Sequence, residues 1–389
     1  MHVLLIARHY PPEISGGARR PSLYLKALRE MGHKVTLVTP FDLDDQNSIY
    51  VYNRAIQNSL SHSSLGHEKA VKVAQSQWGA LKAIARDWVY WPDHNIGWVR
   101  NILRNEELRS LSPDMIFTTS PPESIHIAGA KLAKVFNVPW VAELRDTWVQ
   151  APHRHILSRS LLRRYVERII ARRTLRKAAG VTAVSEAVLR EVRNYVRAGA
   201  PEKVITHFSD TVSDAYPFDP SRLNLVHTGG FTLSDRRRGL LPLLKAMEDI
   251  AMLRPELSFH IAGPLKPEEY ELAKQSRCHV VIHGAVPLAT ARALQKGADG
   301  LVLYTPPDSH ALPGKYSEYC MAGRPILYMG GGDWLALVDA PDKLRPLVEG
   351  GIHLEKGEVC DIDGSLDYKD ASLALIAFFQ SILEPKQSR

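Results

Sequence analysis

The stretch PGKYSEYCMAGRP, at residues 313–325, decides how the rest of the chain is interpreted. It lies between two short apolar runs, residues 300–304 and 325–328, and both runs predict buried strands. Residues 315–322 favour a helix, which the following glycine and proline end. The order strand, loop, helix, strand predicts a parallel α/β unit, and in such sheets ligands bind at the carboxyl ends of the strands.

The start of this predicted helix has the chemistry of an anion site. Gly314 and Lys315 offer backbone N–H groups, a positive dipole end and a cation to an anionic group. Glu318 follows one turn later, where its carboxylate is able to accept hydrogen bonds from sugar hydroxyls. The stretch therefore predicts a site for a phosphorylated sugar compound.

The same residues resemble the donor-site motif of glycosyltransferase family 4, in the form Pro-x-Lys-x-x-Glu-Tyr-x-x-x-Gly-x-Pro. The resemblance implies an α/β protein of the GT-B fold, with two Rossmann-like doubly wound domains facing a central cleft. It also implies that Glu318 binds the ribose hydroxyls of a nucleotide. The family has a second Glu eight positions earlier, where this chain has His310, which either contacts the sugar or only lines the loop.

Composition limits the class of protein. The 389 residues predict two to three domains, and the net charge of +7 favours anionic partners such as a nucleotide, nucleic acid or an acidic membrane face. Three scattered cysteines favour a reducing compartment. The apolar start is too short for a signal peptide, and no window has the length of a membrane helix, so we expect a cytoplasmic protein that is either free or peripheral on the inner face of the membrane.

The beginning of the chain predicts a βαβ unit. Strands at residues 2–7 and 33–39 flank a helix at 22–31, and Gly16 and Gly17 lie in the loop before this helix. The loop lacks the Gly-x-Gly-x-x-Gly dinucleotide fingerprint. The glycine pair predicts either a tight turn or a close approach of the backbone to a phosphate. The family resemblance implies that the pair faces the donor phosphates across the cleft.

Polar residues follow the predicted strand at 138–144, which is a signal for a site. Arg145 and Asp146 are either a solvated pair or part of that site. The segment resembles an acceptor-side motif of the family, with Glu143 at a position where Asp is usual and Trp148 at its end.

His126 lies one turn into the helix predicted before that strand, at residues 124–136. It is the nearest titratable group to Asp146 that could be poised near neutrality, and it is therefore a candidate catalytic residue together with Asp146. A lone helical histidine is also commonly a satisfied core or surface residue, and this alternative stays open.

Residues 153–177 carry many arginines between apolar residues at helical spacing. The pattern predicts a pair of basic amphipathic helices. They are either solvated helices packed on the domain or a surface that docks on an anionic membrane. Nucleic acid is not expected as a partner, because no stacking aromatic residues line the basic face.

The chain then divides into two halves. Prolines at residues 209–222 predict a linker, so we expect an N-terminal acceptor-binding domain at 1–208 and a C-terminal donor-binding domain at 223–389. A final amphipathic helix at 371–383 is expected to pack back on the first domain, as is common in this fold.

A glycine-rich turn with three arginines, Arg236, Arg237 and Arg238, joins the strand predicted at 223–228 to the helix predicted at 240–253. It is either a diphosphate clamp or a solvated basic turn. Family members hold the donor diphosphate with an Arg and a Lys in this loop. Because Gly230 replaces the usual early Arg, the role falls to Arg237 or Arg238 as a catalytic residue.

The patterns and the family resemblance together imply a hexosyltransferase-type glycosyltransferase that uses a nucleotide-diphospho-sugar and no metal or other cofactor, and the resemblance implies that it retains the anomeric configuration. Its acceptor is expected to be a glycan or a lipid-linked hydroxyl compound, as in cell-envelope polysaccharide biosynthesis. Two alternatives remain. One is a Rossmann-type sugar-nucleotide oxidoreductase or epimerase, and the other is a membrane-docking protein that binds nucleotide sugars without turnover.

Overall fold

The structure is a computed structural model that forms two compact units, one of Met1–Thr206 with Ala371–Arg389 and one of His207–Asp370. The residues it describes are 1–13, 16–53, 90–149, 160–210, 214–233, 237–306, 313–332, 334–335, 338, 344–347, 354–361 and 367–384.

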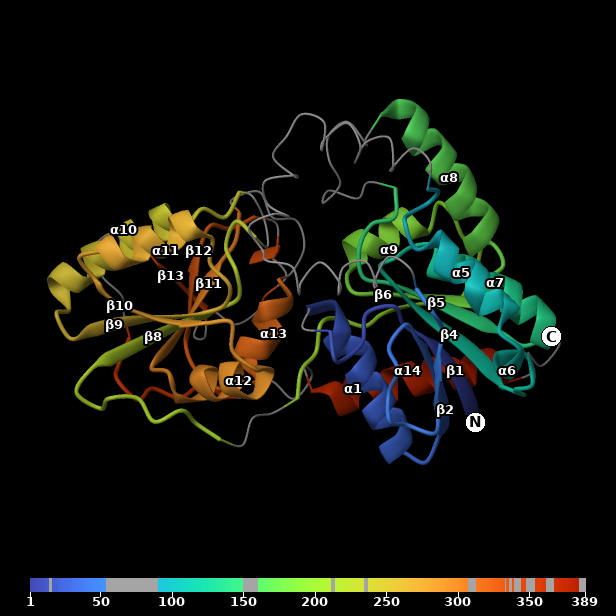
Figure 1. The fold of residues 1–389 in the computed structure, drawn as a ribbon, viewed down its shortest axis with the longest axis horizontal. Helices are drawn as coiled ribbons and strands as arrows, with labels where there is room; N and C mark the ends of the chain where they lie inside the picture. Colours follow the sequence, from blue (N-terminus) through green and yellow to red (C-terminus); the bar gives the residue numbers. More distant parts are fainter. Residues whose placement is uncertain are drawn as a thin grey trace. The chain divides into compact units, whose positions relative to one another are not determined.

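The first unit is built on a parallel sheet of seven strands in the order β3-β2-β1-β4-β5-β6-β7 (Figure 1). Its elements before the second unit are β1 (His2–Ile6), α1 (Gly16–Glu30), β2 (Lys34–Thr39), β3 (Ser48–Tyr50), α5 (Ile96–Arg104), α6 (Glu106–Arg109), β4 (Met115–Ser120), α7 (Ile125–Phe136), β5 (Trp140–Leu144), α8 (Leu161–Leu175), β6 (Gly180–Ala183), α9 (Glu186–Val192) and β7 (Glu202–Val204).

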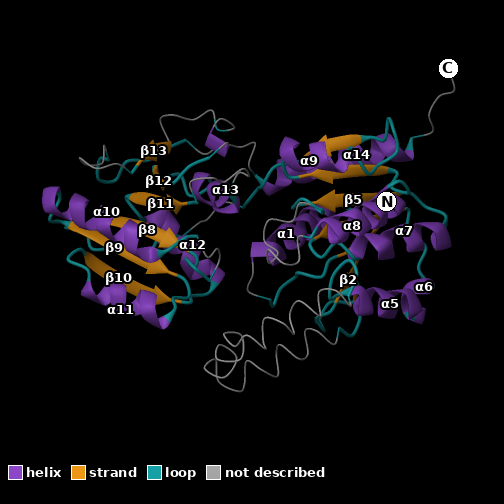
Figure 2. Cartoon of the chain, turned by 90° about the horizontal axis from the view of Figure 1, so that it is seen from above, coloured by secondary structure: helices purple, strands orange, loops and turns teal. Residues whose placement is uncertain are grey.

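The second unit is built on a parallel sheet of six strands in the order β10-β9-β8-β11-β12-β13, and Figure 2 shows these strands side by side. Its elements are β8 (Leu223–Thr228), α10 (Leu240–Leu253), β9 (Leu257–Ala262), α11 (Pro267–Gln275), β10 (His279–Gly284), α12 (Leu288–Gly297), β11 (Gly300–Tyr304), α13 (Gly314–Cys320), β12 (Ile326–Met329) and β13 (Leu344–Pro346).

The central strands are apolar because both faces of each sheet are covered. All six residues of β8 are buried. On one face Leu223 and Leu225 pack with α10, and on the other Val226 packs with residues of α12 and α13. Continuous apolar runs are typical of parallel strands that helices cover on both sides. The predicted class, two doubly wound α/β domains, is therefore confirmed.

Each sheet has one point where the strand order reverses. In the first unit β1 lies between β2 and β4, and in the second β8 lies between β9 and β11. In open parallel sheets the loops that leave such neighbouring strands diverge to opposite faces and leave a crevice at their carboxyl ends. The topology therefore directs attention to the loops after β1 and β4, and to those after β8 and β11.

The last helix, α14 (Tyr368–Leu383), packs against the sheet of the first unit (Figure 1). The ring of Phe379 lies 5.3 Å from that of Phe117 in β4. A Cβ atom added to Gly180 in β6 would come within 2.8 Å of Phe378. Among the described residues, no helix combines the length and the apolar character needed to span a bilayer.

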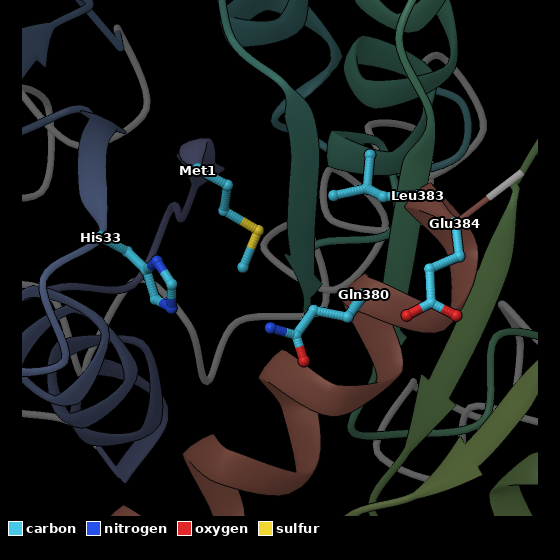
Figure 3. A pocket seen from close by; sticks show the side chains of 5 residues that line it. All are labelled: Met1, His33, Gln380, Leu383 and Glu384. Atoms are coloured by element: carbon cyan, nitrogen blue, oxygen red, sulfur yellow. The ribbon is translucent and has the colours of Figure 1, made fainter.

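A cavity of about 400 Å³ lies at the amino ends of β1 and β2 (Figure 3). It is lined by Met1 and His33, which precede these strands, and by Gln380, Leu383 and Glu384 at the end of α14. In parallel sheets the ligand loops are at the opposite, carboxyl ends. This cavity is therefore not where the topology places a site.

Candidate functional site

In the second unit, the loop after β8 is held very close to its neighbours. Gly229 has φ +117°, a conformation that favours glycine, and a Cβ added there would lie 3.7 Å from Cε of Lys315. A Cβ added to Gly263, after β9, would lie only 2.2 Å from the carbonyl oxygen of Gly229. The turn formed by Gly229 and the buried Gly230 is thus fixed beside α13.

Lys315 and Glu318 lie one turn apart on α13 and face each other. Nζ of Lys315 donates to Oε2 of Glu318 at 2.8 Å. The side chain of Glu318 is 12% exposed and that of Lys315 is 36% exposed. The structure therefore brings the predicted carboxylate and the predicted phosphate-binding cation together at the switch point of the second sheet.

A buried amide supports Glu318 from the neighbouring helix. Nε2 of Gln295, in α12, donates to Oε2 of Glu318 at 3.3 Å and to Oγ1 of Thr228 at 2.8 Å. Thr228 ends β8, and its backbone N–H donates to the hydroxyl of Tyr319 at 3.0 Å. These contacts tie β8, α12 and α13 together directly beneath Glu318.

Arg238 is oriented by two aromatic rings. Nδ1 of His227 donates to the carbonyl of Val302 at 2.8 Å, so Nε2 carries the lone pair and accepts from Nη2 of Arg238 at 3.4 Å. The guanidinium also lies 5.7 Å from the ring centre of Tyr304. Burial, and then the charge of Arg238, lower the pKa of His227 to about 3. The imidazole therefore stays neutral and remains an acceptor for Arg238.

The structure gives fewer contacts for the other residues that the sequence predicted for this site. Arg237 is exposed. Gly314 begins α13, and a Cβ added to it would meet Nδ1 of His207 at an ordinary 3.8 Å. Arg236 and His310 lie outside the described residues, and so do their predicted roles.

In the first unit, Arg145 connects the loops at the switch point. Nε donates to the carbonyl of Ser120, which ends β4, at 2.7 Å, and Nη1 donates to the carbonyl of Gly17 in α1 at 2.6 Å. Pro21 has no N–H, so it cannot make the usual helical bond to the carbonyl four residues earlier, at Gly17. Arg145 takes this carbonyl instead. The residue is buried and is therefore not the solvated partner of Asp146 that the sequence left open.

Glu143 is fully buried at the end of β5 and holds the other side of α1. Arg20 donates to it from Nε at 2.9 Å and forms an ion pair with it through Nη2 at 2.8 Å, Tyr24 donates from its hydroxyl at 3.1 Å, and Thr119 donates at 2.6 Å. Burial alone raises the pKa of Glu143, but the charge and hydrogen bonds of Arg20 outweigh it and lower the pKa overall. Glu143 is thus ionised and connects α1 to the sheet inside the unit. Its role on the acceptor side stays a prediction.

His126 does not have the ionisation behaviour that the sequence predicted. It is completely buried, with its ring 6.1 Å from that of Trp140 and 5.7 Å from that of Trp148. Trp140 donates to Oγ1 of Thr118, and the same oxygen is hydrogen-bonded to Nδ1 of His126 at 2.8 Å. Burial lowers the pKa of His126 to about 3. The expectation of a group poised near neutrality is therefore wrong, because no solvent reaches the ring.

The helix that carries His126 is held by the loop before α5. Oδ2 of Asp93 accepts from the backbone N–H of Ser124 at 2.7 Å, and Oδ1 accepts from its hydroxyl at 2.8 Å. Arg163, in α8, donates to the carbonyl of Pro92 at 3.0 Å and lies 4.5 Å from the ring centre of Trp91. One short loop therefore joins the start of α7 to α8.

The remaining predicted residues of the first unit are at its surface or in its core. Gly16 and Gly17 begin α1, six residues earlier than the helix predicted from sequence. A Cβ added to Gly17 would lie 3.2 Å from Cγ of His9, so close packing accounts for this glycine. Asp146 is exposed, whereas Trp148 is fully buried. No cluster of three metal-ligating side chains is present among the described parts of the chain.

The sequence did not predict three residues of the site in the second unit: His227, Thr228 and Gln295. The first two are polar residues at the carboxyl end of β8, and polar residues in that position are the same signal for a site that follows β5. Gln295 has no comparable signal, because a glutamine within a helix is ordinary. Only the packing of α12 against β8 and α13 reveals it.

Comparisons with known proteins identify the fold. Residues 15–206 match the family described as glycosyl transferase 4-like domain. No curated protein matches the chain in sequence. Among solved structures, the chain is similar to Anabaena HepE in complex with UDP and glucose, with 14% identity, a TM-score of 0.55 and coverage of 98% of this chain and 92% of that one.

Two further solved structures are similar to the chain in fold. Sucrose-phosphate synthase from Thermosynechococcus elongatus has 15% identity and a TM-score of 0.57, with coverage of 99% of this chain and 92% of that one. S. aureus MnaA, in a structure with UDP, has 12% identity and a TM-score of 0.54, with coverage of 100% and 99%. At these identities the similarities establish the fold.

The two doubly wound sheets and the family match together define a glycosyltransferase of the GT-B fold. Within it, residues 15–206 are the part that matches the glycosyl transferase 4-like family. The resemblance deduced from residues 313–325 is thereby confirmed, although that stretch lies outside the matched residues.

Proposed function

We propose that the protein transfers a sugar, with retention, from a nucleotide-diphospho-sugar to a hydroxyl acceptor without a metal ion. The observation that carries the donor half of this proposal is the cluster of Gly229, Lys315, Glu318 and Arg238 after β8 and β11. Two of the structurally similar proteins were solved with UDP, so a UDP-sugar is the first donor to test.

Each residue of the cluster has a role that its chemistry suits. Glu318 accepts hydrogen bonds from the ribose hydroxyls, as carboxylates do. Lys315 and Arg238 stabilise the negative charge that grows on the leaving diphosphate, which is the main electrostatic demand of the reaction. The structure places Lys315 against Glu318 at 2.8 Å, so we propose that this lysine exchanges the carboxylate for phosphate when the donor binds.

Replacing Glu318 tests the donor site. We expect Glu318→Gln to weaken UDP binding by about 1.5–3 kcal/mol, because the charged acceptor of the ribose hydroxyls is lost. Isothermal titration of UDP measures the effect. Glu268→Gln, an exposed change on α11, is the matched control and should leave the affinity unaltered. Equal affinities of the wild-type protein and Glu318→Gln would remove Glu318 from the nucleotide site.

Turnover separates a transferase from a protein that only binds the donor. Release of nucleoside diphosphate from a panel of donor sugars, with and without hydroxyl acceptors, measures it directly. Product anomers determined by NMR then test retention. Binding of UDP without release from any donor in the panel would favour the binding-only alternative.

The outer face of α8 supports an anionic membrane as the place where the acceptor is met. Leu161, Leu162 and Tyr165 are 83%, 60% and 61% exposed at the start of this helix. Exposed arginines follow along it, at Arg168, Arg172, Arg173 and Arg176. Apolar side chains next to a row of cations suit the boundary of an acidic bilayer. We therefore propose a lipid-linked or polysaccharide acceptor of the cell envelope, reached from the cytoplasmic face.

Vesicle binding tests this surface. Basic residues near an acidic bilayer contribute about 1 kcal/mol each, so changing Arg168, Arg172 and Arg173 to Gln should weaken binding to vesicles containing phosphatidylserine roughly 100-fold. Leu161→Ser with Leu162→Ser should weaken it as well, whereas Leu253→Ser, at an exposed position of α10, serves as the control. Equal binding of all variants, or equal binding to neutral vesicles, would contradict the proposal.

A further inference from the structure

Gln295 is buried at the centre of the second unit, yet its amide is only partly satisfied. The side chain is 0% exposed, and both of its hydrogen bonds come from Nε2. Among the described residues, its Oε1 has no hydrogen-bond partner. A buried polar atom without a partner lowers the stability of the fold. Its neighbour Leu294 belongs to the apolar core. A methionine in place of Gln295 would fill the same space without leaving a polar atom unpaired.

The orientation of the amide is set by Glu318. If the amide were flipped, Oε1 would face the Glu318 carboxylate oxygen, and two acceptors would oppose each other at 3.3 Å. With Nε2 facing Glu318, the same N–H₂ group also reaches Thr228. In this orientation the Nε2 group of Gln295 donates to both Glu318 and Thr228, while Oε1 is left without a partner among the described residues.

Glu318 needs a donor that does not leave it. Lys315 also donates to Oε2, but it lies on a long, partly exposed side chain that the proposed function assigns to the diphosphate. Gln295 is held in the interior by Thr228, which is in turn held by Tyr319 at 3.0 Å. The amide is therefore a fixed contact of the carboxylate.

We propose that Gln295 is a positioning residue that holds the Glu318 carboxylate in the orientation that binds the ribose, so that the site selects ribonucleotides over 2′-deoxyribonucleotides. This inference rests on the proposed role of Glu318 at the ribose. It assigns to α12 a part in nucleotide selection, although Gln295 itself does not touch the ligand.

The test uses the full chain with UDP and 2′-deoxy-UDP as probes. For Gln295→Met we expect the Kd of UDP to rise about tenfold, as for the loss of one hydrogen bond to a charged group. The preference for UDP over 2′-deoxy-UDP should fall towards one, and the KM of the donor should rise while kcat changes less than about twofold. The Tm should stay the same or rise, which a residue that only supports the fold would not produce.

A second variant gives a pH signature. Gln295→Glu places a carboxyl group beside Glu318, and two neighbouring carboxylates resist being ionised together. UDP affinity of this variant should therefore recover as the pH falls from 8 to 5, in contrast to the affinity of the wild-type protein. This arm remains informative if Gln295→Met does not fold. Gln275→Met, the same change at an exposed position of α11, is the matched control.

The outcomes distinguish this inference from the proposed function. If Glu318→Gln weakens UDP binding and removes the preference for the ribonucleotide, while Gln295→Met does neither and Gln295→Glu has a flat pH profile, the role of Gln295 is refuted and the donor site stands. If Gln295→Met lowers the Tm and weakens both nucleotides equally, Gln295 is a packing residue. If Glu318→Gln itself has no effect, the ribose role fails and this inference fails with it.

Discussion

Arg20→Met is expected to destabilise the first unit by about 3–5 kcal/mol, the usual result of removing one partner of a buried ion pair. The change leaves Glu143 ionised and buried, with the hydroxyls of Tyr24 and Thr119 as its remaining donors among the described residues. It also removes the donors to the carbonyls of Thr206 at 2.7 Å and Ile205 at 2.8 Å. Urea unfolding followed by tryptophan fluorescence measures the loss.

Two controls define this result. Lys26→Met breaks an exposed pair with Glu30 on the same helix, at 3.9 Å, and should change the free energy of unfolding by less than about 0.5 kcal/mol. The double variant Arg20→Met with Glu143→Gln should be more stable than Arg20→Met alone, because no unpaired charge remains buried. Without Arg20, burial raises the pKa of Glu143, so the loss should be larger at pH 8 than at pH 5. A loss below about 1 kcal/mol at pH 8 would mean that Glu143 is not held as an ion.

Acid is expected to destabilise both units through one buried histidine in each. His126 and His227 have pKa values lowered from 6.5 to about 3 by burial. Below pH 6.5 the unfolded chain therefore binds protons that the folded units do not, so stability is full above that pH and falls as the pH drops towards 3. One proton contributes about 1.4 kcal/mol per pH unit, so each histidine should remove about 3 kcal/mol between pH 7 and pH 4.

Replacing each histidine separates its contribution from those of other titrating groups. His126→Phe should flatten the pH dependence of unfolding of the first unit by about one proton and leave that of the second unit unchanged. His227→Phe should do the converse. Unfolding followed by amide hydrogen exchange reports the two units separately. A slope that is the same in His126→Phe and the wild-type protein would show that His126 is protonated in the folded protein.

Much of the fold could be predicted from the sequence, because apolar runs and helix ends carry the information. The bounds predicted for the strand at 223–228 and the helix at 240–253 coincide with β8 and α10. The start of α1 is six residues earlier than the predicted start at residue 22, and Pro21 lies inside the helix. Within the helix its missing N–H is offset by Arg145, a residue more than a hundred positions away that local patterns cannot include.

The site was less predictable than the fold, because the sequence identifies residue types but not what they contact. The motif around Glu318 predicted that Lys315 and Glu318 share one site, and in the structure these two side chains are in contact. It gave no indication of Gln295 or His227, whose importance depends on strands and helices meeting in the folded unit. For His126, the residue type suggested titration near neutrality, and only the burial between Trp140 and Trp148 excludes it.

The loop at residues 91–95 limits how this protein can be recombined with its relatives. Asp93 accepts a hydrogen bond from the start of α7, and Trp91 and Pro92 contact Arg163 of α8. A chimera that exchanges α8 alone, for example to alter the surface to which the protein binds, would separate Arg163 from its stacking partner and disturb the start of the helix that carries His126. Domain-swapping experiments should therefore transfer residues 91–95, α7 and α8 as a single block.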